Sequence, residues 1–367
     1  MSAETTTAPR KAATPARRRE SIDWGQVVSN YAAVGVLIAF IVGFSIARPE
    51  TFPTLDNFQS IVLTQSVAAL AAFALVAPLV AGEFDLSMGA AISVGAVVVA
   101  KLLGAGFSPI TAILVTIAVG IVIGLANAFL IVGLKVTSFI ATLGTGIILD
   151  GMAIWISANQ TVFEGIGTSF TKLGTGEIFG FLPLPGLYVL VAAALLWYVL
   201  ERTPLGREMY IVGYGRDAAR LAGIKVERRI VLAMVLSSTI ACLAGVLETA
   251  SLGSASPGVG DSFLLPGFAA AFLGSTTIKS GRYNMPGTLI AAILLAVGIT
   301  GFQLLGAASY IQQFFYGGAL IISVAVAQLG VGRLKKRRAP SDAEIAMEPD
   351  AVVASVPEPE PSTKREG

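Results

Sequence analysis

Long apolar runs between residues 27 and 329 constrain this chain more than any other feature. A helix needs about 20 predominantly apolar residues to cross the hydrocarbon core of a bilayer. The third and eighth runs are the weakest candidates, because each is short and begins beside a polar turn. We predict an all-α, polytopic bundle of about ten membrane-spanning helices. The runs lie near residues 27–47, 58–81, 86–103, 109–133, 136–157, 186–201, 230–251, 262–278, 285–305 and 309–329.

The composition agrees with a protein embedded in lipid and excludes several kinds of chemistry. Only 13% of the residues are charged and the mean hydropathy is +0.77, whereas about a quarter of the residues in a soluble domain are charged. The 40 glycines suit helices that approach one another closely. One cysteine and no histidine exclude an intramolecular disulfide, a thiolate cluster and a Ser-His-Asp triad within the chain. We predict no metal site and no catalytic residues.

Both ends of the chain differ in composition from the middle. Residues 1–22 are rich in Ala, Thr, Pro and Arg and predict a disordered basic arm. The next apolar run lacks a small-residue cleavage site, which favours an uncleaved first span over a signal peptide. Residues 333–367 predict a tail that is first basic and then acidic, also disordered. Residues 23–332 are the predicted transmembrane domain.

The distribution of Lys and Arg predicts the orientation, because these residues concentrate in short cytoplasmic loops. With the amino terminus inside, the inner segments hold the basic arm, Lys135, the loop 202–229, Lys279 with Arg282, and the cluster 333–338. The outer segments then hold only Arg48, Lys101 and Lys172. This asymmetry favours an even number of spans with both termini in the cytoplasm.

The loop 202–229 is the most informative polar segment inside the predicted membrane domain. The residues from Glu201 to Arg229 include seven Lys or Arg. Asp217–Leu221 predicts a short amphipathic helix between Gly215 and Gly223. Such a helix is a candidate docking element for another protein, because the small Ala218 and Ala219 would let a partner surface approach. The alternative is an ordinary basic inner loop.

The segment GEFDLSMG, residues 82–89, places Glu83 and Asp85 between two apolar runs. Asp85 could act as the N-cap of the third span by accepting a backbone N–H of its first turn. Carboxylates near membrane depth are costly, however, and often mark a transport path or a structural joint. Glu83, Asp85 and the nearby Ser87 are therefore candidates for either role.

Small and amide residues inside the spans suggest packing or substrate contacts. Gly120, Gly124 and Ala128 recur every four residues and predict a close-packing stripe. Asn127 and Gln303 could each hydrogen-bond a sugar hydroxyl or a neighbouring helix, and packing is the favoured interpretation.

A later segment, residues 274–292, only superficially resembles a phosphate-binding loop. Ile278 occupies a required glycine position, so we do not expect the chain to bind ATP. Few charges occur inside the spans, which disfavours an ion-coupled carrier.

Three segments resemble the ribose- and xylose-type ABC sugar permeases, and the likeness extends over about residues 30–330. GEFDLSMG is similar to their Gly-Ile-Asp-Leu-Ser-Val-Gly segment, and GYGRDAARLAGI, residues 213–224, to their Gly-Asn-x-x-Ala-Ala-x-x-x-Gly-Ile loop. GFAAAFLGSTTIKSGRYNMPGTLIAA, residues 267–292, resembles their late Gly-Gly-x-Ser and Gly-x-x-x-Gly-Thr-Leu-Ile-Gly-Ala region. Three positions depart from the pattern: Glu83 stands where the family usually has Gly, and Gly215 with Arg216 replaces Asn and an acidic residue.

The resemblance implies a homodimeric permease of the bacterial inner membrane without catalytic or nucleic-acid-binding activity. ATP and Mg would bind a separate cytoplasmic ATPase with two cassettes, and an extracytoplasmic binding protein would deliver a monosaccharide. A branched-chain amino acid or another small polar metabolite is the alternative cargo, and an ion-coupled carrier is a third hypothesis. The residues implied to couple to the ATPase are Gly213, Gly215, Arg216, Asp217, Ala218, Ala219 and Gly223.

Overall fold

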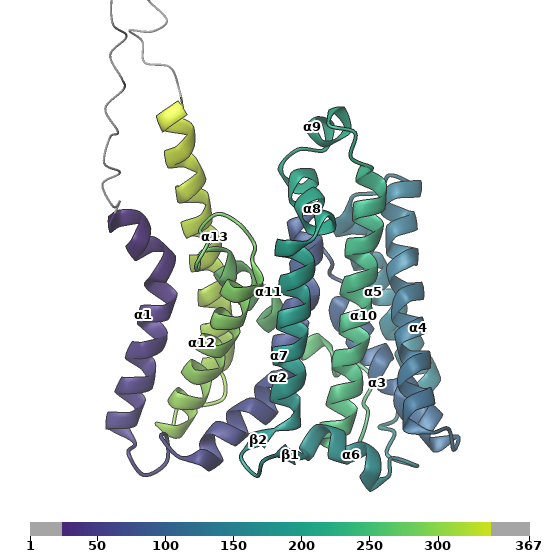
Figure 1. The fold of residues 1–367 in the computed structure, drawn as a ribbon. Coiled ribbons are helices and arrows are strands. Elements are labelled where there is room, and N and C mark those ends of the chain that lie inside the picture. The colour runs from purple at the N-terminus through teal and green to yellow at the C-terminus, as the bar shows by residue number, and fades with distance from the viewer. Residues whose placement is uncertain (1–23, 339–367) are drawn as a thin grey trace, which may run out of the picture.

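The computed structural model describes residues 24–338, and in this range every predicted apolar run is helical (Figure 1). The predicted arm, 1–22, and residues 339–367 of the predicted tail lie outside the described residues. The helices that correspond to the runs are α1 Trp24–Ala47, α2 Leu55–Val80, α3 Met88–Gly104, α4 Pro109–Ala128, α5 Ser138–Ser157, α7 Leu184–Trp197, α10 Val226–Leu252, α11 Asp261–Ser275, α12 Met285–Leu304 and α13 Ile311–Arg338.

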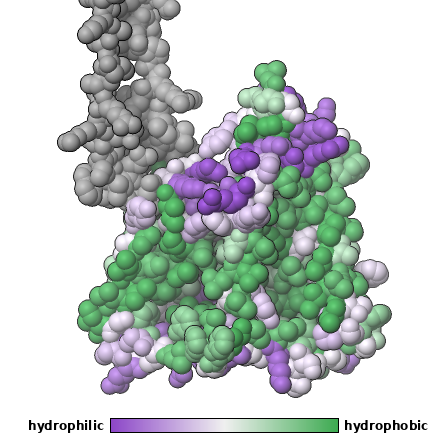
Figure 2. Space-filling model, in the orientation of Figure 1, coloured by the Kyte–Doolittle hydropathy of each residue, from purple (hydrophilic) through white to green (hydrophobic). Residues whose placement is uncertain are grey.

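The lengths and compositions of these helices establish a polytopic helical membrane protein. Six are long and apolar enough to cross a membrane, namely α2, α4, α5, α7, α10 and α12, counting the π-helical ends of α4 and α7. Shorter apolar helices lie within α1, α3 and α13. Large apolar side chains such as Ile110, Ile147 and Trp155 are exposed on the sides of the bundle, and Figure 2 shows a broad hydrophobic lateral surface. Such a surface suits lipid.

Several helix ends follow directly from the sequence. Ser108 accepts the backbone N–H of Thr111 at 3.2 Å, and Pro109 begins α4, where its missing N–H costs no helical bond. Asn284 caps α12 in the same way by accepting the N–H of Gly287 at 2.8 Å. The carboxyl ends of α4 and α7 widen into π-helices, η1 Phe129–Gly133 and η2 Tyr198–Arg202.

Short elements close the two ends of the bundle. At one end lie α6 Thr168–Thr175 and an antiparallel hairpin of β1 Glu177–Ile178 and β2 Leu182–Pro183. At the other lie α8 Pro204–Tyr214 and α9 Arg216–Leu221, which occupy the top of Figure 1. We call these the hairpin end and the α9 end. A helix at Asp217–Leu221 was expected, whereas α6, α8 and the hairpin were not.

Helix α10 is the centre of the bundle and packs on α2, α3 and α4. Glycines bring its backbone against α3: a Cβ on Gly95 would lie 2.6 Å from the carbonyl oxygen of Cys242, and one on Gly245 would lie 2.2 Å from that of Ile92. The middle of α2, residues 71–77, is fully buried beside it. Close glycine contacts of this kind replace the hydrophobic effect, which does not drive helices together in lipid.

The helices α1, α11, α12 and α13 form the other side of the bundle (Figure 1). Aromatic rings join α1 to α12 and α13: the ring centroids of Phe44 and Phe302 lie 5.4 Å apart, and those of Phe40 and Phe315 lie 6.2 Å apart. Helix α13 continues to Arg338, so residues 333–338, which the composition assigned to the tail, are helical.

Candidate functional site

The connection between α2 and α3, residues 81–87, lies in direct backbone contact with the end of α8. Gly82 has a φ of +77°, which a side chain would disfavour. A Cβ on Gly213 would lie 2.1 Å from the carbonyl oxygen of Val80 and 3.3 Å from the nitrogen of Gly82. No side chain fits between the two segments, so the glycine of each segment is needed for this contact.

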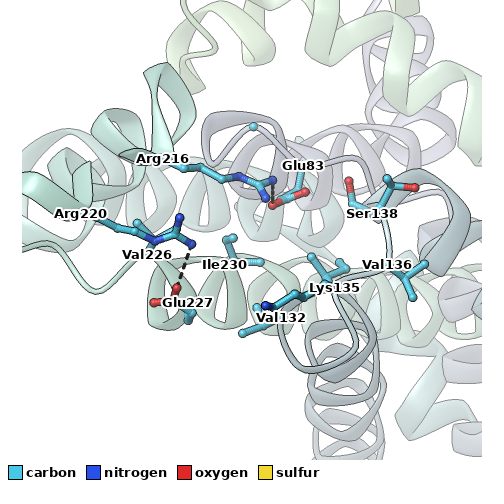
Figure 3. Close-up of a pocket in the computed structure, with 13 residues that line it drawn as sticks. Glu83, Val132, Lys135, Val136, Ser138, Arg216, Arg220, Val226, Glu227 and Ile230 are labelled. Carbon is cyan, nitrogen blue, oxygen red and sulfur yellow. Dashed lines mark hydrogen bonds and ion pairs between the residues drawn. The ribbon is translucent and has the colours of Figure 1, made fainter. Parts of the chain in front are cut away.

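Glu83 joins the same connection to α9 by an ion pair with Arg216 (Figure 3). The Glu83 side chain is 2% exposed, whereas the Arg216 side chain is 47% exposed. Burial raises the pKa of Glu83, and the hydrogen bond with Ser138 and the charge of Arg216 oppose that rise only in part. The buried charge is therefore costly, and Arg216 is its only ion-pair partner among the described residues.

The backbone of the connection is held by hydroxyl groups of α5. The N–H of Phe84 donates to Ser138 Oγ at 3.1 Å, and the N–H of Leu86 donates to Thr142 Oγ1 at 3.0 Å. These donors belong to no helix, and the surrounding helices are apolar. Ser138 and Thr142 thus provide hydrogen bonds that the interrupted α2–α3 backbone cannot make itself.

Asp85, Ser87 and Asn127 form a buried chain of hydrogen bonds at the start of α3. Both the N–H and the hydroxyl of Ser87 donate to Asp85 Oδ1, at 3.0 and 2.6 Å. Asn127 Nδ2, from α4, donates to Ser87 Oγ at 2.8 Å. The N-cap position of α3 is Ser87, two residues after Asp85. The proposal that Asp85 is the N-cap is therefore wrong, although its carboxylate does order the turn that precedes the helix.

This cluster retains buried polar atoms without a hydrogen-bond partner in the described part of the chain. They are Asp85 Oδ2 and Asn127 Oδ1; on α10, which packs on α3 and α4, the hydroxyls of Ser238 and Thr239 also lack a partner. An unsatisfied buried polar group costs about 1–3 kcal/mol. The cluster at the start of α3 is therefore only partly satisfied within the described residues.

The loop 202–229 presents a different surface from the one expected. Gly215 is extended, with a φ of 179°, and links α8 to α9; Gly223 has a φ of +78° after α9. Ala219 lies on the inner side of α9 and is fully buried, so the expectation that it faces a partner is wrong. Ala218 and Asp217 are exposed. A helix of only six residues has too few turns for its buried side to be read from the sequence.

Two apolar residues of this loop were not among the expected docking residues. Leu221 is 91% exposed and Tyr214 is 75% exposed. Figure 2 shows apolar atoms at the tip of α9 above a band of hydrophilic residues. Exposed apolar side chains at a polar end of a protein are typical of an interaction site.

A cavity of about 490 Å³ separates α9 from the turn between α4 and α5 (Figure 3). Its charged lining residues include Glu83, Lys135 and Arg216. Arg220 and Glu227 form a second ion pair at its edge, 3.1 Å apart. The cavity brings Glu83 of the α2–α3 connection together with the charges of the loop 202–229.

The remaining predicted residues lie away from this cavity. Gly120 and Gly124 pack on α10. A Cβ on Gly120 would lie 2.8 Å from Thr239 Cα, and a Cβ on Gly124 would lie 2.4 Å from Val235 Cα. Ala128 belongs to a buried cluster with α10 residues. Gln303 is exposed in the last turn of α12 and is not part of the polar cluster. Within residues 24–338 no group of three or more His, Cys, Asp or Glu could hold a metal.

Comparison with known proteins identifies the family. The chain matches the family described as "Branched-chain amino acid transport system / permease component" over residues 57–324. It is 33% identical over 293 residues to the ribose import permease protein of Bacillus subtilis (strain 168), covering 79% of this chain and 90% of that protein. It is 30% identical over 300 residues to the D-allose transport system permease protein of Escherichia coli (strain K12), covering 82% and 91%.

A third relative is the autoinducer 2 import system permease protein of Salmonella paratyphi A, which is 29% identical over 309 residues, covering 82% of this chain and 92% of that protein. No solved structure shows significant similarity to the chain. The match to the family covers most of the chain, from the first turn of α2 into α13, and includes the whole α9 end. The chain therefore belongs to the permease components of the branched-chain amino acid transport system family.

Proposed function

We propose that this chain is the membrane-spanning subunit of an ATP-driven importer that carries a monosaccharide across the bacterial inner membrane. The observation that carries the proposal is the similarity, over about four fifths of the chain, to permeases named for ribose and D-allose. The permease is non-catalytic, and a separate cytoplasmic ATPase hydrolyses ATP. An extracytoplasmic binding protein delivers the sugar, and two copies of the chain enclose the path.

The cargo assignment is tested by reconstituting the chain with its ATPase and binding protein in proteoliposomes. We expect ribose- or allose-loaded binding protein to stimulate ATP hydrolysis and sugar uptake. Stimulation by branched-chain amino acids alone would refute the sugar assignment. Uptake that persists without ATP and collapses with the proton or sodium gradient would refute the importer itself.

The orientation that we propose has ten spans and places both termini and the α9 end in the cytoplasm. Support comes from Lys135, Lys279, Arg282 and the loop 202–229, since Lys and Arg favour cytoplasmic loops. The buried Cys242 is the only cysteine, so introduced cysteines can be labelled against a silent background. In right-side-out vesicles an impermeant maleimide should label F179C and leave D217C unlabelled; the reverse pattern would refute the orientation.

We propose further that the ATPase docks on the exposed residues Tyr214, Asp217, Ala218 and Leu221. Replacing Leu221 by Glu should reduce co-purification of the ATPase, because a charge would enter the apolar part of the contact. L221M keeps the apolar surface and should bind like the unsubstituted chain. Equal recovery of the ATPase with L221E and L221M would show that α9 is not the docking element.

A further inference from the structure

A backbone contact and an ion pair join α8 and α9 to the α2–α3 connection. The backbone contact between Gly82 and Gly213 fixes the distance between the segments but provides no directional bond. The ion pair between Glu83 and Arg216 connects the two segments directly. Glu83 is separated from Arg216 by 133 residues in the chain. These residues are also the charged positions at which the chain departs from the segments that it resembles.

The connection that Glu83 anchors leads directly to the buried polar cluster. Phe84 and Leu86 bind α5 through Ser138 and Thr142. Asp85, two residues after Glu83, binds Ser87, which in turn binds Asn127 of α4. A displacement of Glu83 therefore acts on a stretch of backbone whose hydrogen bonds lie on two other helices.

The energetics argue against a purely stabilising role for the pair. Burial raises the pKa of Glu83 despite the nearby guanidinium, so keeping this carboxylate charged inside the protein carries a cost. If α9 moved away with Arg216, the Glu83 carboxylate would be left buried without a counter-charge. Separating the pair is therefore unfavourable, which favours movement of the connection together with α9.

We propose that Glu83 and Arg216 are a positioning pair that transmits movement of α9 to the α2–α3 connection and, through it, to Asp85, Ser87 and Asn127. This inference rests on the proposed function, in which the ATPase moves α9. The pair would set how much substrate is moved for each ATP hydrolysed. It would not be needed for the ATPase to bind or to hydrolyse ATP.

The experiment uses the full chain with its ATPase and binding protein in proteoliposomes, and measures substrate imported per ATP hydrolysed. E83Q and R216Q should each lower this ratio by at least about fivefold, the lower range of typical coupling between sites. The double variant E83Q/R216Q should lose no more than either single variant, because each substitution already breaks the same pair. R216K keeps the positive charge and should retain most of the coupling.

A matched control is available at the same end of the bundle. Glu201 has only 9% of its side chain exposed and pairs with Lys279, whose side chain is 43% exposed. Neither residue contacts the α2–α3 connection in any described hydrogen bond or ion pair. E201Q therefore removes a similar ion pair outside the proposed linkage, and its ratio should stay close to that of the unsubstituted complex.

The outcomes separate this inference from the proposed function. Unchanged coupling in E83Q, or losses that multiply in the double variant, would overturn the inference while the unsubstituted complex still imports sugar. An unsubstituted complex without binding-protein-stimulated ATP hydrolysis would instead refute the proposed function. If R216Q fails to fold, E83Q still decides the question, because it leaves the exposed Arg216 in contact with water. The unfolding midpoint of E83Q should equal or exceed that of the unsubstituted chain.

Discussion

Replacement of Gly124 by alanine tests whether the small-residue stripe of α4 holds the helix against α10. The added Cβ would lie 2.4 Å from Val235 Cα and 2.8 Å from the carbonyl oxygen of Met234. Ordinary contact begins at 3.4 Å, and both opposing atoms are backbone. The two helices must therefore separate locally by about 1 Å, which forfeits roughly a quarter to a half of the dispersion energy of the affected contacts.

The expected cost is that of overpacking a close contact, about 1–3 kcal/mol. Alanine also has a higher helix propensity than glycine by up to about 1 kcal/mol, which would hide part of this cost. Gly144 in α5 is the matched control, because a Cβ there has no atom within 4 Å. The propensity gain applies to both variants, so the difference between G124A and G144A isolates the contact with α10.

The assay is reversible unfolding of the purified chain in mixed micelles, followed by tryptophan fluorescence during titration with sodium dodecyl sulfate. G124A should be less stable than G144A by about 1–3 kcal/mol. Equal free energies of unfolding would refute the close contact. Greater stability of G124A would show that α4 and α10 are not in backbone contact at this point.

Three further predictions concern the polar connection and its neighbours. N127A removes the donor to Ser87 and should lower the free energy of unfolding by about 1–3 kcal/mol, measured in the same titration; N127A as stable as the unsubstituted chain would contradict the bond. G213A places a Cβ 2.1 Å from the carbonyl oxygen of Val80 and should lower both stability and substrate imported per ATP, whereas unchanged transport would show that the contact is not tight. The raised pKa of Glu83 predicts a pH dependence of stability relative to E83Q. The folded chain holds the proton of Glu83 more tightly than the unfolded chain does, so this contribution to stability is fully present below the ordinary pKa of 4.5 and is lost as pH rises through the higher folded pKa. If the unsubstituted chain instead became more stable relative to E83Q as pH rises over that range, the direction of the pKa shift would be refuted.

The helices could be predicted from the sequence because their signals are local. An apolar run of 20 residues bounded by Gly, Pro or polar residues has few other outcomes in lipid. The predicted run 109–133 matches α4 with its π-helical end, and both ends agree with the structure. The helix α6 and the β1–β2 hairpin were missed because each is too short to carry a periodic signal.

The candidate site was predictable only in parts. Glu83 and Arg216 were each singled out as departures from a pattern, but nothing in one sequence joins two residues 133 positions apart. Ala219 was assigned to the wrong side of α9, because small size is compatible with both a partner surface and a buried contact. Gln303 was grouped with Asn127 by residue type alone, yet it is exposed while Asn127 is fully buried.

The interruption between α2 and α3 explains why polar side chains of α4 and α5 lie beside this connection. Residues 81–87 leave backbone donors and acceptors outside any helix, and in apolar surroundings each must find a partner. Those partners come from other helices: Ser138 and Thr142 from α5 bind the connection directly, and Asn127 from α4 binds the hydroxyl of Ser87. The connection cannot shift without breaking these bonds together. A segment held in this way favours discrete arrangements over gradual deformation, which is the property required of the link that we propose between α9 and the polar cluster.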